Sequence, residues 1–319
     1  MRYSNKKSRN RVRKIKRARA TILFIITAAF VVCGSVIMAL KFAESIQAVQ
    51  AAEVVDQENS SNSNEQKTAD KSVLSSNSNK QSSDNGDTED VAFVEKYLAQ
   101  QMKGQMPEGA DGKKVVYLTF DDGPSETVTP QILDTLKAEN VHATFFLVGK
   151  AVDESQTNKN LVKRELEEGN AIGNHTYSHN YNYLYPKGTI NVNNIMADIE
   201  KTNQSLKNVL GEDFSTRAIR FPGGHMTWAK KDAKGMESMD KALADKDYHQ
   251  VDWNSLSKDA EGPHKNAAQL KQEVINTMGN KQKLIILMHD TYGKEETAKA
   301  LPEIIKYLKE QGYEFKVLK

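Results

Sequence analysis

From residue 113 to the C-terminus, short apolar stretches alternate with longer stretches in which apolar residues recur every three or four positions. The short stretches predict buried strands, and the longer ones predict amphipathic helices. The predicted strands are KVVYLTF, HATFFLVG, AIGNH, AIRFPG, YHQVDW, KLIILMHD and YEFKVL. The predicted helices are TPQILDTLKAEN, KNLVKRELEEG, NNIMADIEKTNQSLKNVL, AAQLKQEVINTMG and ETAKALPEIIKYLKEQG. This alternation predicts one α/β domain with parallel strands over residues 113–319, either a closed barrel or an open doubly wound sheet.

Two features refine this prediction. The first strand is followed by FDDGPSE, which is not a phosphate-binding glycine-rich loop, so an open nucleotide-binding sheet is disfavoured. The stretch VAFVEKYLAQQMKG has helical periodicity. It predicts a short amphipathic helix within a lead-in segment, residues 90–112.

The N-terminal part has a different character. Residues 1–20 hold ten Lys or Arg and no acidic residue, and residues 21–40 hold no charge. Twenty uncharged, mostly apolar residues are long enough to cross the hydrocarbon core of a bilayer as a helix. The basic flank predicts that this end stays in the cytoplasm, so that everything after the helix lies outside the cell.

A cleaved signal peptide is the alternative for this segment, because AVQAAE offers small residues. The apolar stretch is longer than a signal-peptide core, and the small residues lie well beyond its end. An uncleaved anchor is therefore favoured. Cys33 is the sole cysteine and lies in the apolar stretch, with the bulky Val32 before it. The exported part is thus expected to contain no disulfide, and lipid attachment at Cys33 is not expected.

Residues 41–89 predict a flexible extracellular linker. From Glu53 onward the segment is dominated by Ser, Asn, Gln, Asp, Glu and Lys, with too few apolar residues to offset the entropy of folding.

The charge distribution supports a membrane anchor over a nucleic-acid-binding arm. The chain has 44 basic and 42 acidic residues, and removing the ten basic residues of the arm leaves 34 against 42. A basic arm alone is compatible with nucleic-acid binding. The apolar segment directly after it favours membrane orientation instead. No nucleic acid and no protein partner is predicted.

Polar residues with reactive side chains fall at the ends of five predicted strands. A parallel α/β barrel places the carboxyl ends of its strands on one catalytic face. Each residue alone has an ordinary explanation: a solvated turn, a tight loop, a helix cap at Asp252 or a hydrogen-bonded core histidine. Their shared position at strand ends is what favours a site. The residues are Asp121, Asp122, His175, His179, Arg220, Asp252, His289 and Asp290.

One carboxylate and two imidazoles suit a catalytic Zn²⁺ or another divalent transition metal such as Co²⁺. The second carboxylate of the adjacent pair is then free as a general base for a water molecule. A turn at Gly123 would re-aim one carboxylate away from the other. Arg220 would hold the base by a bidentate contact, and His289 would donate a proton, with Asp252 fixing its tautomer. A 2-His-1-carboxylate iron oxygenase shares the ligand set, but the base, the arginine and the acid favour hydrolysis of an amide or ester.

The series TFDDG, HTYSH, RFPGG, DWNS and LMH resembles the polysaccharide deacetylases of the NodB-homology family over residues 113–319. The resemblance implies a distorted (β/α) barrel of about seven parallel strands. It implies that Asp121 is the catalytic base, that Asp122, His175 and His179 bind the metal, and that His289 is the general acid. Arg220 would steady the base and Asp252 would tune the acid. The substrate pocket would be formed by Gly223, through its backbone N–H, and by Trp253 and Leu287.

One motif differs from the pattern common in the family. Gly223 and Gly224 follow Pro222, where many members have an aromatic or charged residue. This difference changes the predicted shape of the sugar subsite.

The resemblance implies a metal-dependent deacetylase of cell-wall peptidoglycan, with N-acetylglucosamine favoured over N-acetylmuramic acid. A membrane-held enzyme facing the wall would then confer resistance to lysozyme-like muramidases. The alternatives are a chitooligosaccharide or acetylxylan deacetylase, and a non-catalytic wall-binding protein on the same scaffold. A non-catalytic protein is expected to lack a metal or acid–base residue, and none is missing here.

Overall fold

The computed structural model describes residues 87–319. The strands are β1 (Thr88–Glu89), β2 (Val115–Asp121), β3 (Thr144–Leu147), β4 (Ala171–Asn174), β5 (Ala218–Ile219), β6 (His249–Gln250), β7 (Ser255–Leu256), β8 (Lys283–His289), β9 (Glu314–Phe315) and β10 (Val317–Leu318). The helices are α2 (Val91–Met102), α3 (Thr129–Glu139), α4 (Gly149–Glu154), α5 (Gln156–Glu167), α6 (Tyr181–Leu184), η1 (Pro186–Gly188), α7 (Val192–Leu210), α8 (His225–Lys231), α9 (Ala233–Ala244), α10 (Ala267–Met278) and α11 (Glu295–Glu310).

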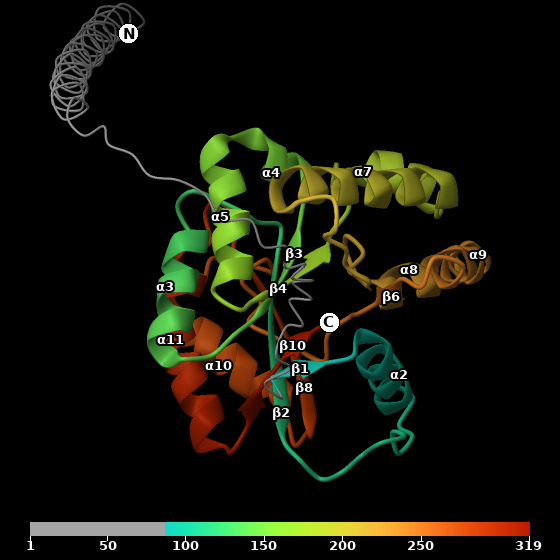
Figure 1. Cartoon of the computed structure of the whole chain (residues 1–319). Coiled ribbons are helices and arrows are strands. Elements are labelled where there is room, and N and C mark those ends of the chain that lie inside the picture. The colour runs from blue at the N-terminus through green and yellow to red at the C-terminus, as the bar shows by residue number, and fades with distance from the viewer. Residues whose placement is uncertain (1–86) are drawn as a thin grey trace, which may run out of the picture. The chain divides into compact units, whose positions relative to one another are not determined.

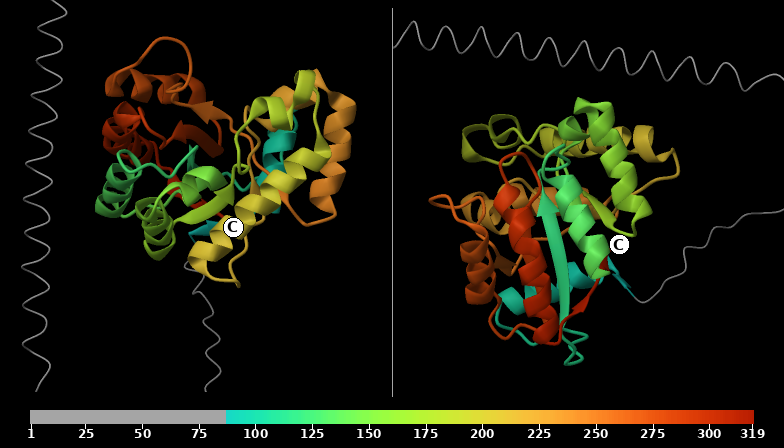
Figure 2. Two further views of the ribbon diagram at one scale, coloured as in Figure 1. Left: turned by 90° about the horizontal axis from the view of Figure 1, so that it is seen from above. Right: turned by 90° about the vertical axis from the view of Figure 1, so that its left-hand side faces the viewer.

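The central sheet is parallel and curled. Its strand order is β6-β5-β4-β3-β2-β8-β7, and β9 also pairs with β2. Residues 251–254 join the two end strands: the N–H of Val251 donates to Ile219 of β5, and that of Asn254 donates to Ile285 of β8. Figure 1 shows α3, α10 and α11 on one side of the strands and α2, α8 and α9 on the other. Figure 2, from above, shows the helices on several sides of the strands. The predicted parallel α/β architecture is thus confirmed as a curled sheet with helices outside it.

The strands at the centre of the sheet are apolar on both faces because both faces are covered. Every residue of β2 is buried, and the seven-residue register of β2 with β8 aligns Asp121 with His289. One core cluster packs this sheet against α3, α5, α10 and α11. This long register is the element that brings two of the predicted site residues to the same edge.

Helix α2 belongs to the same folded unit as the strands. Val91, Val94 and Leu98 are buried together with residues of β2, β3 and β8. Strand β1 pairs in parallel with β10, which ties the segment before α2 to the C-terminus. The packed structure therefore begins before residue 113.

Each of the seven predicted strand ranges contains a strand, and each of the five predicted helices is present. Strands β1 and β7, helices α4, α6, α8 and α9 and the short helix η1 were not predicted, and β1 lies at the end of the predicted flexible linker. The two-residue β7 is too short to show a pattern. Helices α8 and α9 lie in a mostly polar stretch, and they pack through four buried apolar side chains: Trp228, Met236, Met239 and Leu243.

The predicted segments 1–20, 21–40 and most of 41–89 lie outside the described residues. Among residues 87–319, no helix has the length and apolar character needed to span a bilayer.

Glu165 on α5 is an exception to the apolar core. Its side chain is fully buried, and neither carboxylate oxygen has a hydrogen-bond partner within the described part of the chain. Burial and the nearby charge of Asp290 raise its pKa well above the ordinary value. A buried carboxyl group without a partner costs free energy, either as a charge or as a neutral acid.

We therefore expect Glu165→Met to raise the free energy of unfolding by about 1–3 kcal/mol at pH 7. Because folded Glu165 holds a proton that the unfolded state releases, the contribution of Glu165 to the stability of the wild type falls as pH rises above the unfolded pKa of about 4.3. The gain should accordingly be larger at pH 8 than at pH 5, as measured by urea unfolding. Glu167→Met on the same helix is the exposed control. An equal gain at both pH values would contradict this account.

Candidate metal centre and active site

The carboxyl ends of four strands from the middle of the sheet bring the predicted residues together. Asp121 is the last residue of β2, and its register partner His289 is the last residue of β8. His175 follows β4 directly, and Arg220 follows β5 directly. In a parallel sheet these ends meet at one edge. Residues separated by more than a hundred positions in the sequence thus share one site.

Asp122, His175 and His179 form a cluster that fits a metal ion. One ligand atom from each lies within 4.8 Å of the others. The Nε2 atoms of His175 and His179 are each 3.3 Å from Asp122 Oδ1. That oxygen is buried and has no hydrogen-bond partner within residues 87–319. A buried carboxylate oxygen facing two imidazole nitrogens is the donor set of a divalent transition metal.

The local backbone aims these ligands. Asp122, Thr176 and His179 all have positive φ, at 72°, 66° and 47°. Non-glycine residues adopt this region rarely and at a cost, which is typical of functional sites. The positive φ lies at Asp122 itself and not at Gly123, so the expectation that Gly123 re-aims the carboxylate is wrong. Gly123 is required for space, since a Cβ there would collide with the carboxylate of Asp290.

Further contacts fix the ring of His175 and the loop between the two histidines. The Nδ1 of His175 donates to the carbonyl of Arg220 at 2.7 Å, which leaves Nε2 free as a ligand. The N–H and hydroxyl of Ser178 both donate to Asp198 on α7, at 2.8 and 2.7 Å. The loop between the two histidines is therefore held by both the strand edge and a helix.

The residues of the cluster shift one another's pKa values. Burial raises the pKa of Asp122, but its close contact with His175 and the charges of His175, His179 and His289 outweigh burial and lower it. Burial lowers the pKa of His175, whereas Asp121 and Asp122 raise it, and the net direction is upward. Burial and the charge of His175 lower the pKa of His179. The site therefore keeps a carboxylate charged in a buried place and favours one imidazole as neutral.

Asp121 is buried beside the cluster and contacts Arg220. The Nη1 of Arg220 donates to Asp121 Oδ1 at 2.8 Å, and Asp121 Oδ2 lies 3.8 Å from His175 Nε2. Arg220 is fully buried, and it also donates to Thr119 Oγ1, Val251 O and Asp252 O. The predicted pairing is present, but through one nitrogen and not as a bidentate contact, because the other guanidinium donors bind backbone carbonyls.

His289 is held by Asp259 and not by Asp252. The Nδ1 of His289 donates to Asp259 Oδ1 at 2.8 Å, and its Nε2 lies 4.0 Å from Asp122 Oδ2. Burial lowers the pKa of His289, but the hydrogen bond and charge of Asp259, with Asp121 and Asp122, raise it to about 9. The ring is therefore mostly protonated at neutral pH before a cation binds.

The expected role of Asp252 toward His289 is thus wrong. Its two carboxylate oxygens accept hydrogen bonds from the N–H groups of His225 and Met226, at 2.8 and 2.7 Å. Asp252 caps the start of α8, which is the alternative role that its sequence position allowed. Asp259 was missed because it follows β7, a strand too short to be recognised. Had that strand been seen, Asp259 would have counted as one more strand-end carboxylate.

The predicted pocket residues lie around this edge. Leu287 is two residues before His289 on β8 and is buried, so both side chains face the same side of the sheet. Trp253 is half-buried, and the guanidinium of Arg220 lies 5.8 Å from its ring centre. Gly223 is exposed, with φ of 82°. In residues 87–319 its N–H donates to no protein acceptor.

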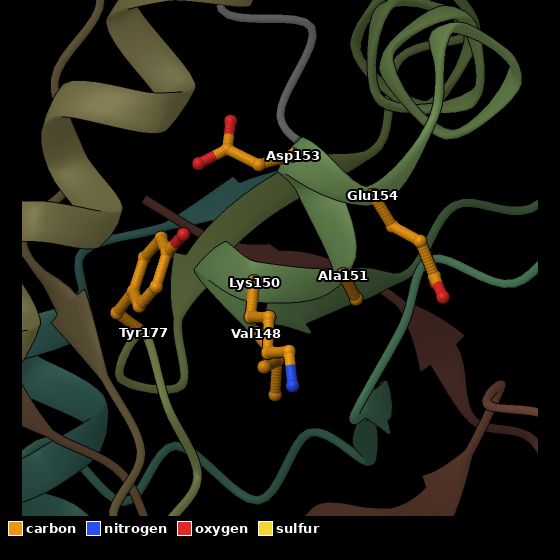
Figure 3. A pocket seen from close by; sticks show the side chains of 6 residues that line it. All are labelled: Val148, Lys150, Ala151, Asp153, Glu154 and Tyr177. Atoms are coloured by element: carbon orange, nitrogen blue, oxygen red, sulfur yellow. The ribbon is translucent and has the colours of Figure 1, made fainter.

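A groove of about 350 Å³ borders the loop that carries the two histidines. It is lined by Val148, Lys150, Ala151, Asp153, Glu154 and Tyr177 (Figure 3). Tyr177 stands between His175 and His179 in the sequence, and its carbonyl accepts a hydrogen bond from the N–H of Lys150. The groove contains none of the cluster residues and so adjoins the site without being its reaction centre.

Comparison with known proteins places this site in a family. The model of the family described as "Polysaccharide deacetylase" matches residues 108–242. A peptidoglycan-N-acetylglucosamine deacetylase of Bacillus cereus is 36% identical over 223 residues, which cover 67% of this chain and 74% of that protein. The chain belongs to the polysaccharide deacetylase family. The NodB-homology resemblance is thereby confirmed.

Two other relatives of this deacetylase show the range of the family. PgdA of Listeria monocytogenes, named a peptidoglycan-N-acetylglucosamine deacetylase, is 34% identical over 69% of this chain and 41% of its own length. The structure of a Streptococcus mutans CE4 esterase matches with a TM-score of 0.64 and 35% identity, over 73% of this chain and 93% of that one. The fold of this chain therefore has a counterpart among solved structures.

Exchanging Asp259 tests the hydrogen bond that holds His289. We expect Asp259→Asn to lower the pKa of His289, because the amide supplies no negative charge. If protonated His289 is needed for turnover, the alkaline limb of the pH–rate profile moves to lower pH. Asp252→Asn is the matched control, because asparagine also caps helices and Asp252 does not contact His289. An alkaline limb that moves in Asp252→Asn and stays in Asp259→Asn would restore the sequence-based assignment.

Proposed function

We propose that this deacetylase is a metal-dependent enzyme that removes N-acetyl groups from the N-acetylglucosamine residues of peptidoglycan. The observation that carries the proposal is the cluster of Asp122, His175 and His179 beside Asp121, with the acid His289 on the adjoining strand end. The names of the relatives in Bacillus cereus and Listeria monocytogenes support the choice of substrate.

Asp122, His175 and His179 would hold the ion, and Zn²⁺ or Co²⁺ fits one carboxylate and two imidazoles. The ion supplies Lewis acidity toward water and toward the carbonyl of the acetamide. Asp121 takes the proton of the attacking water, and the hydrogen bond from Arg220 holds that carboxylate in place. The arrangement therefore separates metal binding and proton abstraction between two adjacent carboxylates.

The remaining residues complete the hydrolysis. The water oxygen bonds to the acetyl carbon, and the N–H of Gly223 donates to the oxygen that gains charge. His289 then gives its proton to the amide nitrogen as the C–N bond breaks, which yields acetate and a free amine. Asp259 keeps His289 protonated for this step. Leu287 and Trp253 would enclose the methyl group of the acetyl moiety.

We also propose a location that suits this substrate. The uncharged segment 21–40 behind a basic arm would anchor the chain in the membrane, with the N-terminus in the cytoplasm. Residues 41–89 would then let the catalytic domain reach the cell wall. Deacetylated sugars carry a cationic amine at neutral pH, so the modified wall would resist lysozyme-like muramidases.

The test is mass analysis of muropeptides before and after treatment of peptidoglycan with the full-length protein in detergent and Zn²⁺ or Co²⁺. A loss of the acetyl mass from N-acetylglucosamine, with matching acetate release, is expected. Acetate release from acetylxylan or chitin oligomers, but none from peptidoglycan, would reject the proposed substrate. Walls from cells that lack the protein should have fewer free amines and be more sensitive to muramidase.

A further inference from the structure

The tyrosine of α6 nearest the metal cluster, Tyr181, lies between two parts of the proposed active site. Its ring is 5.6 Å from that of His179, measured between centroids, and meets it edge-on. A Cβ built on Gly223 would lie 2.9 Å from the Tyr181 hydroxyl. The hydroxyl therefore occupies the space where any side chain at position 223 would begin.

Both polar groups at this place are free of protein partners. In the described part of the chain, no hydrogen bond of the Tyr181 hydroxyl to a protein group is present, and the N–H of Gly223 likewise donates to none. The Tyr181 side chain is 44% exposed, so its hydroxyl can reach a ligand in the site. Two donors without a protein partner, on residues in close contact beside the candidate metal cluster, are thus available to an acceptor oxygen of a bound ligand.

The surroundings hold this arrangement in place. Trp228 Nε1 and the hydroxyl of Tyr185 both donate to the carbonyl of Pro222, at 2.8 and 3.2 Å. The rings of Tyr185 and Trp228 stack 3.6 Å apart, and Tyr181 packs against both at 5.8 and 6.0 Å. The turn that carries Gly223 and the ring of Tyr181 thus rest on the same aromatic pair, which limits their relative movement.

We propose that the Tyr181 hydroxyl is a second hydrogen-bond donor to the acetamide carbonyl oxygen of the substrate, beside the N–H of Gly223. The proposal rests on the proposed deacetylase function. The proposal also explains why residue 223 is a glycine: a side chain there would collide with the hydroxyl of Tyr181. A donor aimed at an oxygen that gains negative charge contributes most in the transition state.

The experiment compares Tyr181→Phe with Tyr183→Phe in the full-length protein, with acetate release as the readout. Tyr183 lies on the same short helix and is similarly exposed, at 40%, and it has no contact with Gly223. We expect Tyr181→Phe to lower kcat by about 10- to 100-fold with little change in KM, because one of two donors is lost. Tyr183→Phe should stay within about twofold of the wild type. Zinc content and melting temperature should not change.

A double-mutant cycle with Gly223→Ala makes the test specific to this contact. The alanine Cβ would displace the Tyr181 hydroxyl, so Gly223→Ala should cost more activity in the wild type than in Tyr181→Phe. Equal costs in the two backgrounds, or an active Tyr181→Phe beside an inactive Tyr181→Ala, would overturn the inference while the deacetylase function stands. A wild-type protein that releases no acetate would overturn both.

Discussion

Asp121→Asn is expected to lower kcat by about 100- to 10,000-fold while the protein keeps its metal, because the amide cannot take a proton from water. Asparagine has the same size and can still accept the hydrogen bond that Arg220 Nη1 donates to Oδ1 at 2.8 Å. This matters because Arg220 is fully buried, and a buried cation without a partner would destabilise the fold by about 3–5 kcal/mol. The exchange therefore removes the general base and preserves the hydrogen bond between residue 121 and Arg220.

Three measurements on one preparation check this expectation: zinc content, acetate release and melting temperature. Asp122→Asn is the neighbouring control, because it removes charge from the oxygen that faces both imidazoles. It should lose zinc as well as activity. If Asp121→Asn loses the metal and Asp122→Asn keeps it, the roles of the two carboxylates must be exchanged.

His175→Ala is expected to abolish activity by loss of the metal. His175 is almost fully buried and is oriented by the carbonyl of Arg220, so neither water nor another side chain can readily take its place. Loss of a residue that merely orients a ligand weakens metal binding by about 10- to 100-fold. Loss of a ligand should exceed this range.

Zinc titration with a competing chelator measures the affinity directly, and thermal unfolding gives a second readout. Bound zinc stabilises the native state by mass action, so the melting temperature of the wild type should rise with zinc and that of His175→Ala should not. His142→Ala is the control, because His142 precedes β3 at the end of the sheet away from the cluster. A His175→Ala protein with unchanged zinc affinity would remove His175 from the ligand set.

Asp121, Asp122 and Arg220 show how the sequence could reveal much of this site. Each stands at the end of an apolar strand, and strands separated by helices run parallel. Parallel strands place their carboxyl ends at one edge of the sheet. A residue at the end of one strand is therefore predicted to lie near the residues at the ends of the other strands. The register of β2 with β8 then aligns Asp121 with His289 as this logic requires.

Asp252 and Asp259 show where that logic stops. Both are carboxylates on the stretch that joins β6 to β8, and both are buried near the site. Their hydrogen-bond partners depend on the path of the chain after each strand end, which decides which donors lie nearby. Asp252 accepts a hydrogen bond from the first N–H of α8, and Asp259 accepts one from His289. The periodicity of the sequence does not predict such contacts between loops.

By itself the sequence determined the parallel α/β architecture and the set of metal-binding and catalytic candidates, because both follow from apolar runs and strand ends. Only the tertiary structure decided that α2 shares the core, that Asp259 holds His289, and that the Tyr181 hydroxyl lies beside Gly223. These contacts join elements distant in sequence through short strands and loops. The geometry of these contacts depends on how the whole domain packs, so it cannot be predicted from local residue patterns.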